Sequence, residues 1–377
     1  MTDTTTTAPA RLATRLAFWA AGAATGCCAP LFPFVKSQIG ASESVFGMVL
    51  LCLGLGSVIA MPVTGVVATR KGARPIILTS GLGLALILPL LPLSSSAVMA
   101  GAVLFVFGAC LGTLDVAMNV HGAEVEQREG RALMSGFHAS YSVGALLGAG
   151  FMTLALLAGL GLFLATLCGA LCVGAAMVAT RNGLLRARGG AAEPLVRPRG
   201  IVLLLAILAG IAFLSEGVVL DWSGLLIIDL DLVSPTSAGL GYILFSIAMV
   251  IARLSGDYVV QRLGGFRLLV WGGLIAIAGV VLILTCPWRA GALSGFVLIG
   301  LGLANLVPIV FSAAGRQTLM PAGLAVAAVT TTGYAGILLG PALIGFAAEA
   351  TSLPAAFWLL ALLLTAFPLC ARRVMRA

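Results

Sequence analysis

Three of the side chains that can gain and lose protons inside long apolar stretches are the candidates for proton coupling. They are Glu216, Asp115 and His138. A charge in the middle of a helix in lipid costs roughly 2.5–3.5 kcal/mol on insertion scales, and the charges that remain usually face a cavity or a partner. We therefore expect these residues to exchange protons at a polar site. The alternative for each is a contact that holds a neighbouring helix.

Two candidates for substrate contact, Asp221 and Trp222, follow Glu216 on the same apolar stretch. Five residues turn an α-helix by about 140°, so Glu216 and Asp221 share a face only if the helix breaks. Gly217 could allow such a break. Trp222 could stack on a ligand or mark the membrane interface.

Asp115 belongs to a stripe of small and polar residues at helical spacing. Its members are Gly108, Gly112, Asp115, Asn119 and Gly122. Glycines on one face let another helix approach closely. The stripe is therefore expected to pack against a neighbouring helix, with the acid and the amide at the seam.

His138 lies near the start of the next apolar run, and Tyr141 follows on the same side. Histidine changes its charge near neutral pH. His138 and Asp115 are expected at similar depths on consecutive spans, so the two could pair.

Arg253 is the one basic residue inside an apolar run. Asp257 lies four residues further on, so the two could pair along one helix. The rival interpretation is an anion-binding arginine that faces Glu216 or Asp115. The residues expected to contact a polar substrate are Asn119, Tyr141, Asp221, Trp222, Arg253, Asn305 and Tyr334.

The composition defines the surroundings of these residues. Of 377 residues, 60% are apolar and 9% are charged, against roughly 45–50% and about 25% in soluble proteins. So few charges cannot cover a water-soluble surface, and the chain is expected to be an all-α polytopic membrane protein. The same numbers exclude disordered, collagen-like, coiled-coil and disulfide-stapled proteins.

Twelve apolar runs are long enough for a membrane-spanning helix, which needs roughly 20 residues. The expected spans are about 14–34, 43–69, 75–93, 97–120, 133–158, 160–180, 200–228, 235–260, 268–286, 290–314, 322–349 and 353–370. The twelve spans leave no room for a separate soluble domain.

The basic residues indicate the orientation. With the N-terminus inside, eighteen of the 21 Lys and Arg residues fall in cytoplasmic segments, and only Lys36 and Arg289 face outward. Short loops rich in Lys and Arg stay in the cytoplasm. Both termini are therefore expected on the cytoplasmic side of a plasma membrane of the bacterial inner-membrane type.

The sequence repeats itself weakly at an offset of 192 residues. Arg70-Lys71-Gly72 falls on Arg262-Leu263-Gly264, and Gly108 falls on Gly300. The repeat predicts two six-helix halves of parallel topology, residues 1–181 and 200–377, joined by a basic cytoplasmic linker at 182–199.

The segment before 75 resembles a family motif, G-x-x-x-D-R-x-G-R-R, which Gly65, Arg70, Gly72 and Arg74 match while Thr69 stands at the acid position. Over its full length the chain resembles the major facilitator superfamily. The resemblance implies a transporter that works by alternating access, with no cofactor. The expected cytoplasmic gate comprises Arg70, Arg74, Glu126, Arg131, Asp257 and Arg262.

Longer strings give a narrower resemblance. Asp115-Val-Ala-Met-Asn119, His138-Ala-Ser-Tyr141 and Thr331-Thr332-Gly333-Tyr334 are similar to the MosC-like branch, which is linked to rhizopine handling and is a distant neighbour of fucose permeases. This resemblance implies a small polar cargo that is sugar-, polyol- or amino-polyol-like. Protons are the expected coupling ion, and a monomer in contact with membrane lipid is the expected state.

Two other functions fit the sequence less well. Proton-coupled exporters of lipophilic drugs usually carry an arginine four residues before the glycine at 108, where this chain has Leu104, and a Gly-Pro where it has Gly148-Ala149. A non-transporting receptor would need a docking domain that the spans do not leave room for. An enzyme is not expected, and no G-x-x-x-x-G-K-[ST] loop indicates ATP.

Nucleic acid and metal partners are not expected either. The net charge of +8 comes from residues in short gaps between spans, where orientation places them, rather than on a soluble face. The eight cysteines lie in apolar runs without metal-ligand spacing, which favours packing roles.

Overall fold

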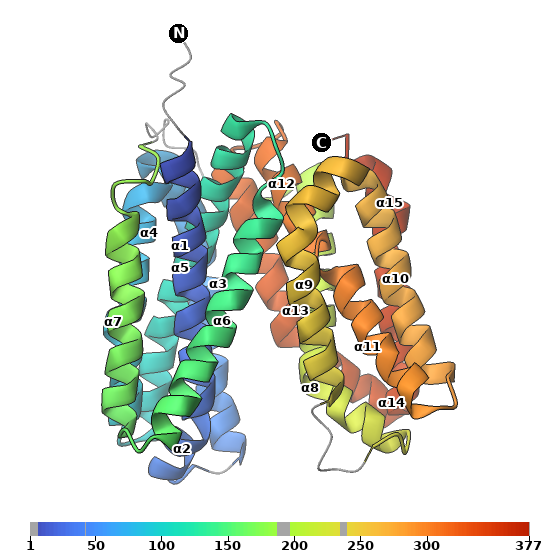
Figure 1. The fold of residues 1–377 in the computed structure, drawn as a ribbon, viewed down its shortest axis with the longest axis horizontal. Helices are drawn as coiled ribbons and strands as arrows, with labels where there is room; N and C mark the ends of the chain where they lie inside the picture. The colour runs from blue at the N-terminus through green and yellow to red at the C-terminus, as the bar shows by residue number, and fades with distance from the viewer. Residues whose placement is uncertain (1–6, 42, 187–196, 234–239, 377) are drawn as a thin grey trace. The chain divides into compact units, whose positions relative to one another are not determined.

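The computed structural model describes residues 7–41, 43–186, 197–233 and 240–376, and every regular element in these ranges is helical (Figure 1). The elements are α1 (Ala8–Cys28), η1 (Ala29–Leu31), α2 (Phe32–Gln38), α3 (Glu43–Lys71), α4 (Ala73–Ile87), η2 (Leu88–Leu93), α5 (Ala97–Glu129), α6 (Met134–Leu157), α7 (Leu162–Thr180), α8 (Ile201–Asp229), α9 (Leu240–Leu263), α10 (Gly265–Thr285), α11 (Arg289–Leu303), α12 (Leu306–Arg316), α13 (Ala322–Ala350), α14 (Leu353–Leu364) and α15 (Ala366–Val374). The η elements are short 3₁₀ helices.

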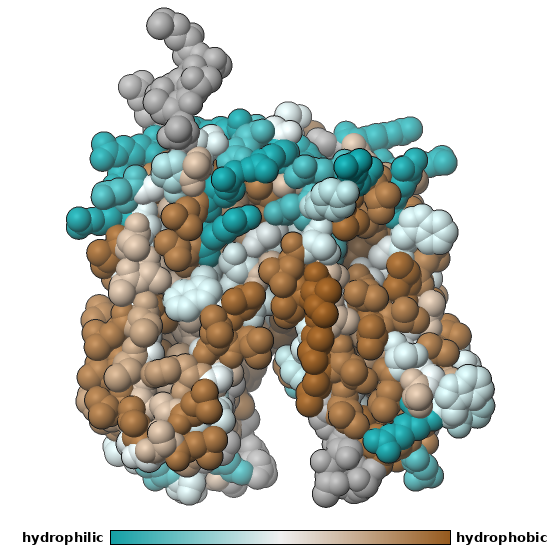
Figure 2. Space-filling view, in the orientation of Figure 1, coloured by the Kyte–Doolittle hydropathy of each residue, from teal (hydrophilic) through white to brown (hydrophobic). Residues whose placement is uncertain are grey.

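The fold class expected from the composition is confirmed. In the described part of the chain, eleven stretches are long and apolar enough to cross a membrane. The remaining expected span, 14–34, is divided among α1, η1 and α2, because α1 ends at Cys28 and two prolines follow. In Figure 2 most of the visible surface is apolar, and hydrophilic residues gather mainly at the upper end of the view.

Most expected spans agree with the helices, and the differences lie at helix ends. The fourth expected span, 97–120, continues as helix to Glu129. The expected span 235–260 begins in part outside the described residues, since α9 starts at Leu240. Part of the expected linker at 182–199 also lies outside the described residues, which leave out 187–196.

The chain folds into two compact units. Unit 1 comprises Met1–Gly130, Phe137–Arg197 and Met320–Ala328, and unit 2 comprises Arg131–Gly136, Pro198–Leu319 and Val329–Ala377. The short segments that end at Gly136 and Ala328 lie 192 residues apart, which is the offset of the sequence repeat. The starts of α6 and α13 therefore occupy corresponding places in the repeat.

The repeat extends to backbone geometry inside each unit. Gly72 and Gly264 begin α4 and α10 with φ of 75° and 78°, a conformation that favours glycine at both tight connections. In unit 1 a Cβ on Gly108 would collide with the carbonyl oxygen of Leu53. In unit 2 a Cβ on Gly300 would collide with that of Phe245, again 192 residues on.

The glycine stripe of α5 packs against α3, as its spacing predicts. A Cβ on Gly112 would lie 2.8 Å from Cα of Ser57. Ser57 Oγ also donates a hydrogen bond to the carbonyl oxygen of Gly108 at 2.8 Å. Small residues thus bring the two backbones together, and a side-chain hydroxyl joins them.

This close approach predicts a specific sensitivity. Gly108→Ala should lower the thermal unfolding temperature of the detergent-purified protein, because overpacking costs roughly 1–3 kcal/mol. Gly150→Ala is the matched control on α6, since nothing lies within 4 Å of the added Cβ. The control should be neutral or stabilising by about 0.5–1 kcal/mol. Equal unfolding temperatures for the two variants would contradict the close helix contact.

Candidate functional site

Arg253 of α9 connects three elements of unit 2. Its Nη2 lies 3.1 Å from Oε1 of Glu216 on α8, and its Nε donates to the carbonyl oxygen of Ala304 at 3.2 Å. The Arg253 and Glu216 side chains are 9% and 19% exposed. The structure therefore supports the interpretation in which the arginine faces Glu216.

The Ala304 carbonyl lies where a membrane-spanning stretch is interrupted. α11 ends at Leu303 and α12 begins at Leu306 within the stretch Arg289–Arg316. Pro308 has no backbone N–H, so it cannot bond the carbonyl four residues before it. Arg253 supplies the missing donor. Non-helical backbone at membrane depth is tolerated where it is buried in protein or lines a cavity.

Asn305 occupies the interruption itself. Its Nδ2 donates to the carbonyl oxygen of Ala252 on α9 at 3.5 Å. Its Oδ1 is buried and, within the described residues, has no hydrogen-bond partner. A buried acceptor without a donor costs about 1–3 kcal/mol. Asn305 is therefore a place where a donor group of a ligand would be favoured.

Asp257 follows Arg253 by one turn and contacts the start of α6. Its Oδ1 accepts a hydrogen bond from the backbone N–H of Gly136 at 2.9 Å. The first N–H groups of a helix lack intrahelical partners and carry partial positive charge, which a carboxylate satisfies. The carboxylate thus holds a helix end in unit 2.

Three other residues of unit 2 were expected to contact a substrate, and each has its own surroundings. α8 is continuous from Ile201 to Asp229, so the break considered at Gly217 is wrong, and Asp221 is exposed away from the face of Glu216. Trp222 lies beside α13, where a Cβ on Gly345 would be 3.2 Å from its ring. The ring of Tyr334 packs 6.2 Å from that of Phe213 on α8.

In unit 1, the structure brings Asp115 and Asn119 together on α5. Asn119 Nδ2 donates to the carbonyl oxygen of Asp115 at 2.9 Å and to its Oδ1 at 3.2 Å. Both residues are buried, and Asn119 Oδ1 has no hydrogen-bond partner within the described residues. The pair is a second buried polar cluster.

The predicted residues of α6 pack against α1. The ring of His138 lies edge-on to Phe18, with centroids 5.2 Å apart. Tyr141 donates from its hydroxyl to Thr25 Oγ1 at 3.3 Å. These contacts join α1 and α6. The role of His138 and Tyr141 in a polar site stays a prediction.

The predicted gate residues lie in different local environments. Arg74 donates to the carbonyl oxygen of Arg181 at 2.8 Å, and the guanidinium of Arg262 lies 5.3 Å from the ring centre of Tyr258. Glu126 is buried, whereas Arg70 and Arg131 are exposed. Their gating role stays a prediction.

His121 is a buried polar residue that the sequence pattern did not indicate as part of a site. Its Nε2 accepts a hydrogen bond from the backbone N–H of Leu185 at 2.9 Å. The neutral ring must therefore carry its proton on Nδ1, which lies 2.9 Å from Thr14 Oγ1. Thr14 in turn donates to the carbonyl oxygen of Ala10 at 2.7 Å.

This chain of hydrogen bonds ties α1 and α5 to the segment that follows α7. The available signal in the sequence was a second histidine two residues after Asn119, on the run that carries Asp115. Its partners are more than 60 residues away along the chain, so spacing alone did not reveal them.

These hydrogen bonds predict energetic coupling between Thr14 and His121. Each of the variants Thr14→Val and His121→Ala should destabilise unit 1, because each leaves a buried polar group without a partner. The double variant should cost less than the sum of the single variants by about 1 kcal/mol, the usual net value of a hydrogen bond. Thermal unfolding in detergent measures the three effects, and strict additivity would exclude the bond.

The ion pair predicts a different pattern. Arg253→Gln should destabilise the protein by roughly 3 kcal/mol, because it leaves Glu216 without a counter-charge in a mostly buried position. Adding Glu216→Gln should recover part of that loss, since the double variant no longer buries an unpaired charge. Unfolding temperatures at pH 8 test this order, and a double variant that unfolds earlier than Arg253→Gln would refute it.

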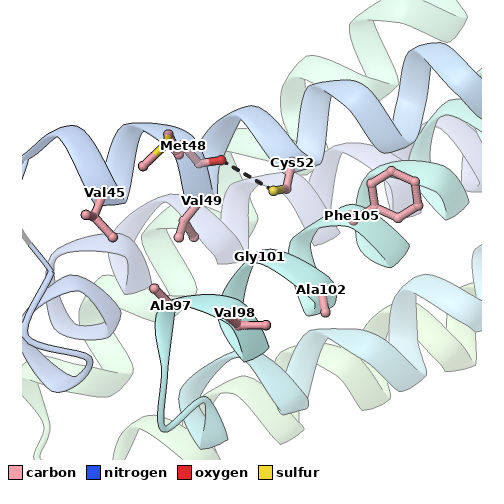
Figure 3. A pocket seen from close by; sticks show the side chains of 9 residues that line it. All are labelled: Val45, Met48, Val49, Cys52, Ala97, Val98, Gly101, Ala102 and Phe105. Atoms are coloured by element: carbon pink, nitrogen blue, oxygen red, sulfur yellow. Dashed lines mark hydrogen bonds between the residues drawn. The ribbon is translucent and has the colours of Figure 1, made fainter.

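A separate apolar groove lies in unit 1 between α3 and α5 (Figure 3). Its volume is about 410 Å³, and its lining residues are Val45, Met48, Val49, Cys52, Ala97, Val98, Gly101, Ala102 and Phe105. The Cys52 thiol donates to the carbonyl oxygen of Met48 at 3.3 Å. Because no charged side chain lines it, the groove suits an apolar chain rather than a polar solute.

Within the described residues, no group of three or more His, Cys, Asp or Glu is arranged for a metal ion.

Known proteins are similar to this chain over most of its length. Residues 16–322 match the family described as the Major Facilitator Superfamily. An uncharacterized MFS-type transporter of Yersinia pestis is 45% identical over 371 residues, covering 97% of this chain and 96% of that protein. The membrane protein MosC of Rhizobium meliloti is 30% identical, covering 89% and 83%. A variant of the E. coli fucose:proton symporter FucP has the same fold, with a TM-score of 0.73 at 16% identity over 97% of this chain and 98% of that one.

Proposed function

Because the chain belongs to the Major Facilitator Superfamily of membrane transporters, we propose that it moves a small polar organic solute by alternating access, coupled to protons. The observation that carries this proposal is the Arg253–Glu216 ion pair beside an interrupted helix. Ionisable residues inside membrane spans most often belong to substrate or proton pathways.

Glu216 is the proposed proton carrier. Its side chain is 19% exposed, and one of its carboxyl oxygens lies 3.1 Å from Nη2 of Arg253. Taking up a proton neutralises the carboxyl and weakens its attraction to the guanidinium. One proton can therefore change the contacts between α8 and α9, and a coupled transporter needs a change of this kind.

The chemical groups of the two polar clusters support a polar cargo. Unit 2 offers a guanidinium, a carboxyl and an amide, and unit 1 offers the Asp115–Asn119 pair. The groups suit sugar-, polyol- or amino-polyol-like solutes. Similarity to MosC and the fold of a fucose:proton symporter agree with this class.

The proposed setting is the plasma membrane, with both termini in the cytoplasm and the protein acting as a monomer. The distribution of Lys and Arg supports this orientation. We further propose that the starts of α6 and α13 take part in the cytoplasmic gate. Support comes from the bond of Asp257 to Gly136 and from the close contact between Gly323 and Thr69. The proposed domain division remains 1–181 and 200–377.

The proton role makes a direct prediction for transport in liposomes. Glu216→Gln should abolish uptake driven by a pH gradient, because the amide cannot take up a proton, while exchange between equal internal and external pools of solute should persist in part. Asp229→Asn is the matched control, since this acid lies exposed at the end of the same helix. Equal loss of uptake and exchange in Glu216→Gln would exclude a coupling role.

A further inference from the structure

We propose that Arg253 anchors a carboxylate group of the transported solute, and that this carboxylate replaces Glu216 on the guanidinium when Glu216 takes up a proton. The inference rests on the transport function proposed above. It narrows the cargo to solutes that carry one negative charge on a polar body, such as sugar acids and other polyhydroxy acids.

The charge of the pair is the first argument. Arg253 stays protonated at physiological pH, while Glu216 can be a carboxylate or a neutral acid. The two side chains are only 9% and 19% exposed. When Glu216 takes up a proton, its attraction to the guanidinium weakens and this small volume gains one positive charge. An entering carboxylate restores the balance, whereas a neutral sugar does not.

The orientation of the guanidinium is the second argument. Its Nε is held by the Ala304 carbonyl oxygen and its Nη2 by Glu216 Oε1. Because the group is planar, two bonds on different nitrogens fix its plane. When the Glu216 carboxyl leaves, Ala304 still holds the other side, so a donor remains aimed at the vacated position. Guanidinium–carboxylate bonds are among the strongest in proteins.

The helix interruption is the third argument, because it adds Asn305 to the groups around the ion pair. Interrupted spans at membrane depth commonly form solute sites in transporters. Asn305 lies in this interruption, and its buried Oδ1 has no hydrogen-bond partner within the described residues. A hydroxyl of a polyhydroxy acid is a donor that this oxygen can accept. The site therefore offers one anchor for a carboxylate and one acceptor for a hydroxyl.

The helices of unit 2 carry further charged or titratable groups, which are Asp221 and Asp229 on α8, Tyr258 and Arg262 on α9, Arg267 on α10, Arg289 on α11 and Glu349 on α13. α9 adds Asp257, which bonds the N–H of Gly136, and α13 adds Tyr334, which packs on Phe213. α14 contains no titratable residue. α12 and α15 carry their charged groups in their last turns, at Arg316, Arg372 and Arg373. Among these groups, Glu216 is the acid whose carboxyl oxygen lies 3.1 Å from the Arg253 guanidinium, so its protonation acts directly on the arginine.

Binding to purified protein tests the inference first. The probes are gluconate, its neutral amide gluconamide and the polyol glucitol, read as thermal stabilisation at pH 6 and pH 8. Gluconate should stabilise the wild-type protein at pH 6. Its apparent affinity should fall by about tenfold per pH unit once most molecules have lost the Glu216 proton, because only the protonated form binds.

The variants separate this mechanism from general charge effects. Glu216→Gln should bind gluconate at pH 8 as tightly as the wild type does at pH 6, because its site is permanently in the proton-loaded charge state. Adding Arg253→Gln should abolish that binding. Asp229→Asn, which changes the net charge equally, should behave as the wild type. Loss of gluconate binding in Glu216→Gln, or its survival in the double variant, would overturn the inference.

Transport in liposomes gives a second, independent test. One proton carried with one carboxylate moves no net charge, so gluconate uptake should respond to a pH gradient and ignore a membrane potential set with potassium and valinomycin. Proton-driven uptake of glucitol or gluconamide that is accelerated by a negative interior would refute the carboxylate anchor while leaving the proposed function intact. No uptake of any probe would overturn both proposals.

Discussion

The carbonyl oxygen of Ala304 lies in the middle of a membrane span, and the proline four residues later cannot bond it. In lipid no water takes the place of the missing donor, so the protein must supply one. Arg253 does so, and it thereby brings a permanent charge into the span. That charge requires a counter-charge, which Glu216 provides. The interruption, the arginine and the acid therefore depend on one another, and the functional proposals follow from this dependence.

The same constraint explains why much of the fold could be predicted from the sequence. A span must be long, apolar and helical because lipid offers its backbone no partners, so apolar runs give most helices within a few residues. The glycines at 72 and 264 were also readable, because a tight turn with positive φ leaves few alternatives to glycine. The apolar pattern did not predict the polar turns that extend a helix beyond its apolar run. α5 runs to Glu129 because its last turns leave the apolar run and keep their helical hydrogen bonds.

The residues of the candidate site could be predicted from the sequence, but the contacts between them could not. Glu216, Arg253 and Asn305 stand out because polar groups in lipid are costly, and this cost is visible in the sequence. That Glu216 is a partner of Arg253 depends on how α8 and α9 pack, and spacing along one helix could indicate only Asp257. The interruption at Asn305 was not predicted, although Pro308 three residues later is a signal for it in the sequence. His121 was missed because its partners come from distant helices.

The repeat separates what the two halves share from what they do not. Glycine contacts recur at an offset of 192 residues in both units, so the scaffold is duplicated. Asp257 and Gly65 are repeat mates, yet they hold helix ends in different ways. Asp257 bonds the N–H of Gly136 at the start of α6, whereas a Cβ on Gly323 at the start of α13 would lie 3.1 Å from the carbonyl oxygen of Gly65. One helix end is thus held by a charge and the other by close backbone packing. A charged contact responds to salt and to neighbouring charge, and a packed one does not, so only the contact in unit 2 can be influenced electrostatically by the ion pair one turn away on α9.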